Sequence, residues 1–230
     1  MLKRLLKDSY GRYQRGAPAH ADQAALRRLR RRLGCFAATE AGLVDAVATL
    51  REPWQAYVTS VSPPAMAASL EVCVLLLALA RAQRPARVLD LGSGFSSFVT
   101  RSFAREAGGA CRVTSVGDSA EWLGRTRVFL GKRGVPTDDM LTWEAFRGTA
   151  SGPFELIFHD LGDMSVRAAA LPHVLGRVAP GGIVVLDDMH KTGYPEQVRR
   201  TCGSAGFDIH PVPMLTTDPF GRFAAIAVAA

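Results

Sequence analysis

The stretch that decides the fold runs from Val88 to Ser97 and reads VLDLGSGFSS. A short apolar run that ends in glycines is typical of a buried parallel strand entering a tight turn, and a helix is predicted from Phe95 onward. Gly92 and Gly94 let the backbone of this turn approach a ligand closely, although a purely structural glycine turn is the alternative. A P-loop is excluded because no GK[ST] follows, and Ser97 replaces the third glycine of a GxGxxG dinucleotide motif.

Downstream of this turn, apolar runs alternate with helical patterns. Six further strands are predicted, the last two as an antiparallel pair, at 111–118, 140–146, 153–162, 181–189, 207–213 and 222–229. Strands that alternate with helices indicate a doubly wound, Rossmann-like α/β fold. We therefore predict a mostly parallel sheet with an antiparallel last strand, preceded by N-terminal cap helices.

The cap helices are predicted from local signals. Residues 39–56 have the pattern of one or two short helices. A longer helix is predicted to begin after Ser62 and to end near Gln83, since serine suits the N-cap and Pro63 suits the first helical position.

Basic charge is concentrated at the N-terminus, and we divide the chain into an arm and cap at 1–56 and a main domain at 57–230. The net charge is +7, and ten of the 28 Lys and Arg residues lie within residues 1–34. Three leucines recur there at helical spacing among arginines: Leu26, Leu29 and Leu33. The pattern predicts an amphipathic helix that packs on the domain or forms a homodimer, with binding of RNA as the alternative.

Composition excludes several classes of protein. A chain of 230 residues with 48% hydrophobic and 21% charged residues is ordinary for one globular domain. The longest strongly apolar run, 72–80, is too short for a membrane span, and no secretory signal is expected. The four cysteines contain no CxxC pair, which argues against a zinc knuckle or a disulfide scaffold and predicts a cytoplasmic protein.

Four motifs in order carry a resemblance to a known family: VLDLGSGFSS, SVGDSAEWLGRTR, FELIFHDLG and APGGIVVLDDMH. Over residues 57–230 the chain resembles class I S-adenosylmethionine-dependent methyltransferases, and the nearest branch is the catechol O-methyltransferase-like group. The resemblance implies S-adenosylmethionine as cofactor. It also implies that Gly92, Ser93 and Gly94 border the methionine part of the cofactor, with Asp90 supporting their loop.

One position departs from the family pattern. The family has an acidic residue at the end of the second strand, where a carboxylate accepts both ribose hydroxyls, but this chain has Gly117, followed by Asp118. Either Asp118 takes over the ribose contact, or it is the N-cap of the next helix and the cofactor is bound weakly. Trp143, Glu144 and Ala145, at the carboxyl end of the third predicted strand, are candidates for the adenine pocket, with core packing as the alternative for Trp143.

Carboxylates end two further strands. Asp160 follows the strand within 153–162, and Asp187 and Asp188 follow the strand within 181–189. The carboxyl ends of neighbouring parallel strands meet at one edge, so we expect the three side chains near the cofactor turn. Clustered carboxylates repel one another unless a cation is present, and oxygen ligands suit Mg²⁺. A magnesium site is therefore predicted, with direct cofactor or substrate binding by Asp160 as the alternative.

His190 is the candidate general base, because it lies just after the carboxylates in the loop at the same edge. Strand alternation points His159 away from Asp160, which favours a packing role for this histidine. Lys191 and Tyr194 are candidates to line the acceptor pocket. The lysine base that the catechol-type branch has shortly after the fourth-strand aspartate is absent here.

These observations predict an enzyme that transfers a methyl group from S-adenosylmethionine to a small hydroxylated acceptor, with Asp160 and His190 as catalytic residues and with assistance from Mg²⁺. Two alternatives stay open. One is a nucleic-acid methyltransferase that uses the basic arm, although the NPPY or DPPY motif of many base N-methyltransferases is missing. The other is a non-catalytic binding protein with a degenerate methyltransferase fold, which Gly117 permits.

Overall fold

A computed structural model describes residues 40–229, which form a seven-stranded sheet in the order β3-β2-β1-β4-β5-β7-β6. The strands are β1 (Arg87–Leu91), β2 (Arg112–Gly117), β3 (Met140–Thr142), β4 (Phe154–His159), β5 (Val178–Leu186), β6 (Phe207–Pro211) and β7 (Ala225–Ala229). The pairs among β1 to β5 are parallel, and β7 runs antiparallel to both β5 and β6. The predicted doubly wound sheet with an antiparallel last strand is confirmed.

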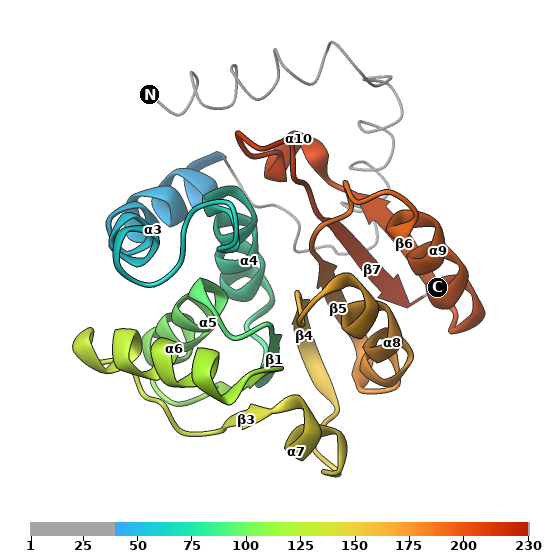
Figure 1. The fold of residues 1–230 in the computed structure, drawn as a ribbon, viewed down its shortest axis with the longest axis horizontal. Coiled ribbons are helices and arrows are strands. Elements are labelled where there is room, and N and C mark those ends of the chain that lie inside the picture. Colours follow the sequence, from blue (N-terminus) through green and yellow to red (C-terminus); the bar gives the residue numbers. More distant parts are fainter. Residues whose placement is uncertain (1–39, 230) are drawn as a thin grey trace.

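Helices cover both faces of this sheet (Figure 1). One face carries α3 (Glu40–Ser60), α4 (Leu70–Gln83), α5 (Phe95–Glu106) and α6 (Ala120–Lys132), and the other carries α7 (Trp143–Arg147), α8 (Met164–Leu175) and α9 (Tyr194–Ser204). Strand alternation divides the core accordingly, since Val88 and Phe158 face the first layer while Leu89 and Ile157 face the second. A short helix, α10 (Pro213–Thr216), lies in the connection between β6 and β7.

The helix predicted from Ser62 begins seven residues later than Pro63. Its N-cap is Ser69, whose hydroxyl accepts a hydrogen bond from the Val72 N–H at 3.1 Å. The segment before it is a turn whose backbone carbonyls accept hydrogen bonds from Arg222, a residue far away in the sequence. Because this tertiary contact holds the turn, the Ser-Pro signal at Ser62 does not start a helix.

The third predicted strand, 140–146, is correct only over Met140–Thr142. The Thr142 hydroxyl then accepts a hydrogen bond from the Ala145 N–H at 3.3 Å and caps the short helix α7. Trp143 and Glu144 therefore lie in a helix and not in a strand.

Helix α3 crosses the predicted domain boundary between residues 56 and 57. It is one continuous helix, and its Ala46, Leu50 and Tyr57 are fully buried in the core against α4 and α5. The leucine and arginine segment of the predicted arm lies outside the described residues. Among residues 40–229, no helix has the length and apolarity needed to cross a membrane.

Candidate active site

Gly92 lies where the turn after β1 (residues 92–94, the glycine turn) meets the neighbouring strands. The Gly92 N–H donates to the Val116 carbonyl at 2.8 Å, and its φ of +121° is one that side-chain-bearing residues rarely adopt. A Cβ atom here would lie 2.6 Å from the backbone oxygen of Asp160. Glycine is therefore required at this position by both conformation and space.

Gly94 is under a weaker constraint. Its φ is −127°, and a Cβ atom would lie 3.3 Å from the hydroxyl oxygen of Tyr57, which comes from helix α3. A small shift of that tyrosine would accommodate a side chain. Helix α3 thus closes the glycine turn on one side, a contact that no sequence motif indicates.

Ser93 combines an unusual backbone with an unused hydroxyl. Its φ is +35°, its side chain is fully buried, and the Thr126 hydroxyl donates to its carbonyl at 2.7 Å. The Ser93 Oγ has no hydrogen-bond partner among the described residues. A buried polar atom without a partner is costly, and strained residues tend to gather at functional sites. This turn therefore fits a polar ligand such as the methionine part of S-adenosylmethionine.

Asp90 lies beneath the turn, completely buried in β1. Its Oδ2 accepts a hydrogen bond from the Ser97 hydroxyl in the first turn of α5, and burial raises the pKa of its carboxyl group. This contact ties β1 to the start of α5. The predicted role of Asp90 as a support of the loop agrees with this geometry.

Gly117 ends β2 in a space that is already filled. A Cβ atom there would lie 3.1 Å from Leu123 Cγ and 3.3 Å from Ser93 Cβ, so a carboxylate would not fit without rearrangement. Asp118 is exposed, and a Cβ added to Gly162 in the loop after β4 would lie 2.9 Å from its Oδ2. The N-cap of α6 is Ser119, whose hydroxyl accepts from the Trp122 N–H, so the N-cap alternative for Asp118 is wrong.

The adenine-pocket candidates lie together on α7 but face different surroundings. The Trp143 ring packs against Phe146 and His173, with ring centroids 6.0 and 5.4 Å away. Glu144 is exposed and forms an ion pair with Arg147 at 2.6 Å. Trp143 therefore contributes to packing between α7 and α8, and the adenine role of both residues stays a prediction.

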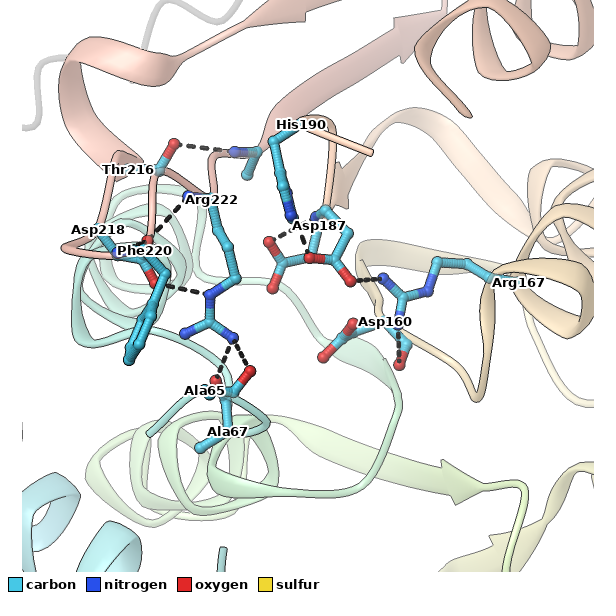
Figure 2. Close-up of polar contacts among 12 residues, drawn as sticks. Ala65, Ala67, Asp160, Arg167, Asp187, His190, Thr216, Asp218, Phe220 and Arg222 are labelled. Carbon is cyan, nitrogen blue, oxygen red and sulfur yellow. Dashed lines mark hydrogen bonds and ion pairs between the residues drawn. The ribbon is translucent and has the colours of Figure 1, made fainter. Parts of the chain in front are cut away.

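Asp160, Asp187 and Asp188 (the carboxylate cluster) do gather at the ends of β4 and β5, but a basic residue meets them there. Arg167 of α8 places Nη2 2.5 Å from Asp160 Oδ1 and Nη1 2.8 Å from Asp188 Oδ2. The arginine side chain is only 5% exposed. Figure 2 shows Arg167 on one side of the aspartates and Arg222 on the other.

Burial dominates the electrostatics of the cluster. It raises the pKa of Asp160, which Arg167 opposes, and it raises the pKa of Asp187 to about 6 with help from the neighbouring Asp188. Asp187 Oδ1 also accepts a hydrogen bond from the Asp188 N–H at 2.7 Å, and Asp188 has a left-handed φ of +58°.

This donor set does not fit the predicted magnesium site. Arg167 already engages one oxygen of Asp160 and one of Asp188. Within residues 40–229, no three His, Cys, Asp or Glu side chains are arranged to hold a metal ion. The charge repulsion that motivated the metal prediction is relieved by a guanidinium group instead.

The two histidines lie in different surroundings, and His159 points away from Asp160 as the alternation of side chains along a strand predicts. His159 is fully buried on the far face of β4, where its Nε2 lies 2.9 Å from the Arg167 carbonyl oxygen, and burial lowers its pKa to about 4. His190 stays at the carboxylate edge, with Nδ1 3.4 Å from Asp188 Oδ1, and burial lowers its pKa as well. A neutral imidazole at this place can accept a proton. Tyr194, an acceptor-pocket candidate, is 4% exposed, whereas Lys191 is exposed.

Arg222 is a second functional candidate that the sequence analysis missed. Its Nε lies 2.6 Å from Asp218 Oδ2, and its guanidinium donates to the carbonyls of Pro64, Ala65 and Ala67. It thereby ties the loop between β6 and β7 to the segment before α4, beside the carboxylate cluster (Figure 2). The one available signal for Arg167 was a basic residue early in the helix that follows Asp160. Arg222 had no such signal.

Comparisons with known proteins agree on the fold. No family model matches the chain, and no curated protein matches it. Among solved structures, an SAH-bound methyltransferase from Podospora anserina is 17% identical, with a TM-score of 0.61 over 79% of this chain and 87% of its own.

Two solved O-methyltransferases also match. One from Bacillus cereus, in complex with SAH, is 19% identical, with a TM-score of 0.59 over 80% of this chain and 91% of its own. TomG from Streptomyces achromogenes, in complex with SAM, is 20% identical, with a TM-score of 0.55 over 82% and 89%. The chain thus has the fold of class I S-adenosylmethionine-dependent methyltransferases.

Proposed function

We propose that this chain transfers a methyl group from S-adenosylmethionine to a hydroxyl group of a small molecule. The observation that carries the proposal is the direct contact between the glycine turn and the end of β4, where a Cβ on Gly92 would touch the Asp160 carbonyl. A ligand on the turn therefore lies beside the carboxylate cluster. Ligands of doubly wound sheets bind at this edge.

The glycine turn and the residues around it would hold the cofactor. The backbone of Gly92 to Gly94 approaches the methionine part, and Ser93 Oγ supplies a buried polar atom that has no partner among the described residues. Asp118, exposed at the end of β2, would accept the ribose hydroxyls that the family's strand-end acid binds. When bound, the cofactor supplies an electrophilic methyl group on a sulfonium.

The residues at the ends of β4 and β5 would act on the acceptor. His190 is held near Asp188 by the 3.4 Å contact, at the edge where an acceptor hydroxyl would be presented. In this proposal His190 accepts the proton of that hydroxyl as the general base, and Asp160 orients the cofactor and the acceptor. Arg222 fixes the two segments that border this edge, so it keeps the acceptor side in place.

The proposal is tested first by cofactor binding. Titration calorimetry with S-adenosylmethionine should give one site per chain, and Gly94→Val should abolish it while the protein stays folded, because Tyr57 can move aside. Gly131→Val, at a helical glycine with open space around it, is the matched control and should bind normally. No heat with the parent protein would favour the non-catalytic binding protein instead.

The acceptor class is tested by isotope-labelled methyl transfer. Small catechols and other hydroxylated molecules should become labelled. His190→Ala should lower kcat and leave the KM for the cofactor nearly unchanged. Label found in RNA but in no hydroxylated small molecule would favour the nucleic-acid alternative. The roles predicted for the basic arm are tested by deleting residues 1–34: a packing or dimer role predicts a lower melting temperature or a changed mass in solution, and an RNA-binding role predicts loss of label from RNA.

A further inference from the structure

The carboxylate cluster already contains a cation within the chain. The planar guanidinium of Arg167 bridges Asp160 at the end of β4 and Asp188 after β5. Arginine binds carboxylates through several N–H groups in a fixed geometry, unlike a mobile lysine. One side chain thereby neutralises two strand ends at once.

The position of this guanidinium is fixed from several directions. Its Nη2 also donates to the backbone carbonyls of Asp160 at 3.2 Å and Gly162 at 3.1 Å. The backbone of the same residue is held by His159, whose Nε2 lies 2.9 Å from the Arg167 carbonyl oxygen. Asp163 caps the helix from which Arg167 projects, through hydrogen bonds from the N–H groups of Ser165 and Val166. These hydrogen bonds hold the guanidinium of Arg167 in one position within the site.

We propose that Arg167 is the resident cation of the carboxylate cluster, in the place where a divalent metal ion would otherwise bind, and that this edge works without a metal. An octahedral Mg²⁺ site needs free carboxylate oxygens and demands near-ideal geometry. Here Asp160 Oδ1 and Asp188 Oδ2 engage the guanidinium, and Asp187 Oδ1 accepts from a backbone N–H. A second cation placed among them would also be repelled by the first.

The carboxylate cluster lies at the edge of the sheet where we propose methyl transfer, and any role of Arg167 in that reaction rests on the proposed function. The tests below measure metal binding and not turnover. Failure of the methyltransferase proposal would therefore leave the question of the cation intact, and a metal found here would leave cofactor binding intact.

The first test uses the unaltered protein. Manganese(II) is titrated into the metal-free chain, and its electron paramagnetic resonance signal reports free ion. We expect the signal to stay that of free ion up to millimolar protein. A site with one manganese per chain that is lost in Asp160→Asn would overturn the proposal.

The second test removes the guanidinium. Arg167→Gln should leave three carboxylates without their cation, so this variant should gain manganese binding and a magnesium-dependent rise in Tm. Arg101→Gln is the matched control, because Arg101 is equally buried but donates to the Ser115 hydroxyl and to backbone carbonyls. It should show no response to magnesium.

A folded Arg167→Gln protein that binds no metal would show that the guanidinium is not what occupies a cation site, and would overturn the proposal. Arg167→Lys keeps the positive charge, so it should behave like the parent protein and bind no metal. If Arg167→Gln does not fold, the titration of the parent protein and of Arg167→Lys decides the matter.

Discussion

The glycine turn and the carboxylate cluster lie side by side at one edge of the sheet, but they are built on opposite principles. At the glycine turn and at the adjoining end of β2, positions depend on the absence of side chains: a Cβ at Gly92 or at Gly117 would meet atoms within 3.1 Å. At the cluster, positions are fixed by charge, with Arg167 between Asp160 and Asp188. Added volume at Gly92 would therefore disturb the first half, and lost charge at Arg167 would disturb the second.

This difference separates what each half can do. A surface made of backbone and small residues can lie flat against a ligand and discriminate by shape. A surface made of buried charges can orient polar groups without reorganising, because the charges are already in place. The two properties suit a bound cofactor and a reacting hydroxyl, respectively.

The largest effect should come from breaking the charge balance. Arg167→Met leaves the carboxylates of Asp160 and Asp188 without their partner, and we expect the free energy of unfolding to fall by about 3–5 kcal/mol. Denaturation with urea at neutral pH measures the loss. Raised pKa values of Asp160 and Asp187 should make this variant relatively more stable in acid, because protonation then relieves the repulsion.

A surface pair provides the control for this loss. Arg125 and Glu121 are four residues apart on α6, both largely exposed, with a nitrogen–oxygen distance of 2.6 Å. Arg125→Met should change stability by no more than about 0.5 kcal/mol. Equal losses in the two variants would mean that the cluster is no more dependent on charge than the surface, and the comparison would fail.

The next effect concerns the support of Arg167 and depends on pH. His159 has a pKa of about 4 in the folded chain, below its ordinary value of about 6.5. Above pH 6.5 the imidazole is neutral in both states, but below it the unfolded chain takes up a proton that the folded chain does not. Stability should therefore fall by about 3 kcal/mol between these two pKa values.

His159→Gln isolates this contribution, since an amide can still donate to the Arg167 carbonyl but does not titrate. Urea denaturation of both proteins at neutral pH and at about pH 4.5 should show a smaller acid-induced loss in the variant. Parallel pH profiles would mean that His159 has no part in the acid sensitivity.

The sheet and the glycine turn were predictable from sequence because their signals are local. The apolar run from Val88 and the two glycines after Leu91 specify strand, turn and helix within ten residues. The start of α4 was not predictable in this way. Arg222 donates hydrogen bonds to the carbonyls of the turn before α4, and it lies more than 150 residues away in the sequence. Where such a long-range contact holds a segment, it determines the start of the helix and the local capping signal does not.

The distinction between local signals and long-range contacts also explains which parts of the candidate site were predictable. Strand ends brought the three aspartates together as expected, because the carboxyl ends of parallel strands share an edge. The pairing of Asp160 and Asp188 with Arg167 was not predicted, since Arg167 lies in the following helix and only the direction of its side chain reveals the contact. The tight space around Gly117 is likewise set by Leu123 and Ser93, which no motif connects.

A smaller effect should come from adding volume at the glycine turn. Gly92→Ala forces an alanine to a φ of +121° and places its Cβ 2.6 Å from a backbone oxygen. We expect a loss of about 2–3 kcal/mol in the free energy of unfolding. Gly124→Ala, in α6 with open space around it, should instead stabilise the chain by about 0.5–1 kcal/mol. A neutral result at Gly92 would remove the volume argument.

The smallest effect tests whether one charge does matter on the glycine side. Asp118 follows the strand end where the family's acid is replaced by Gly117, and its exposed carboxylate is the one we expect to accept the ribose hydroxyls. Loss of a charge-assisted hydrogen bond costs about 1.5 kcal/mol, so Asp118→Ala should weaken S-adenosylmethionine binding about tenfold, with the Tm unchanged. Asp138→Ala removes the same charge just before β3, at the amino-terminal end of the parallel strands, and should leave the affinity for the cofactor unaltered. Titration calorimetry compares the two variants, and equal affinities would assign the ribose contact to water and backbone alone, because no carboxylate at this end of β2 would then take part in it.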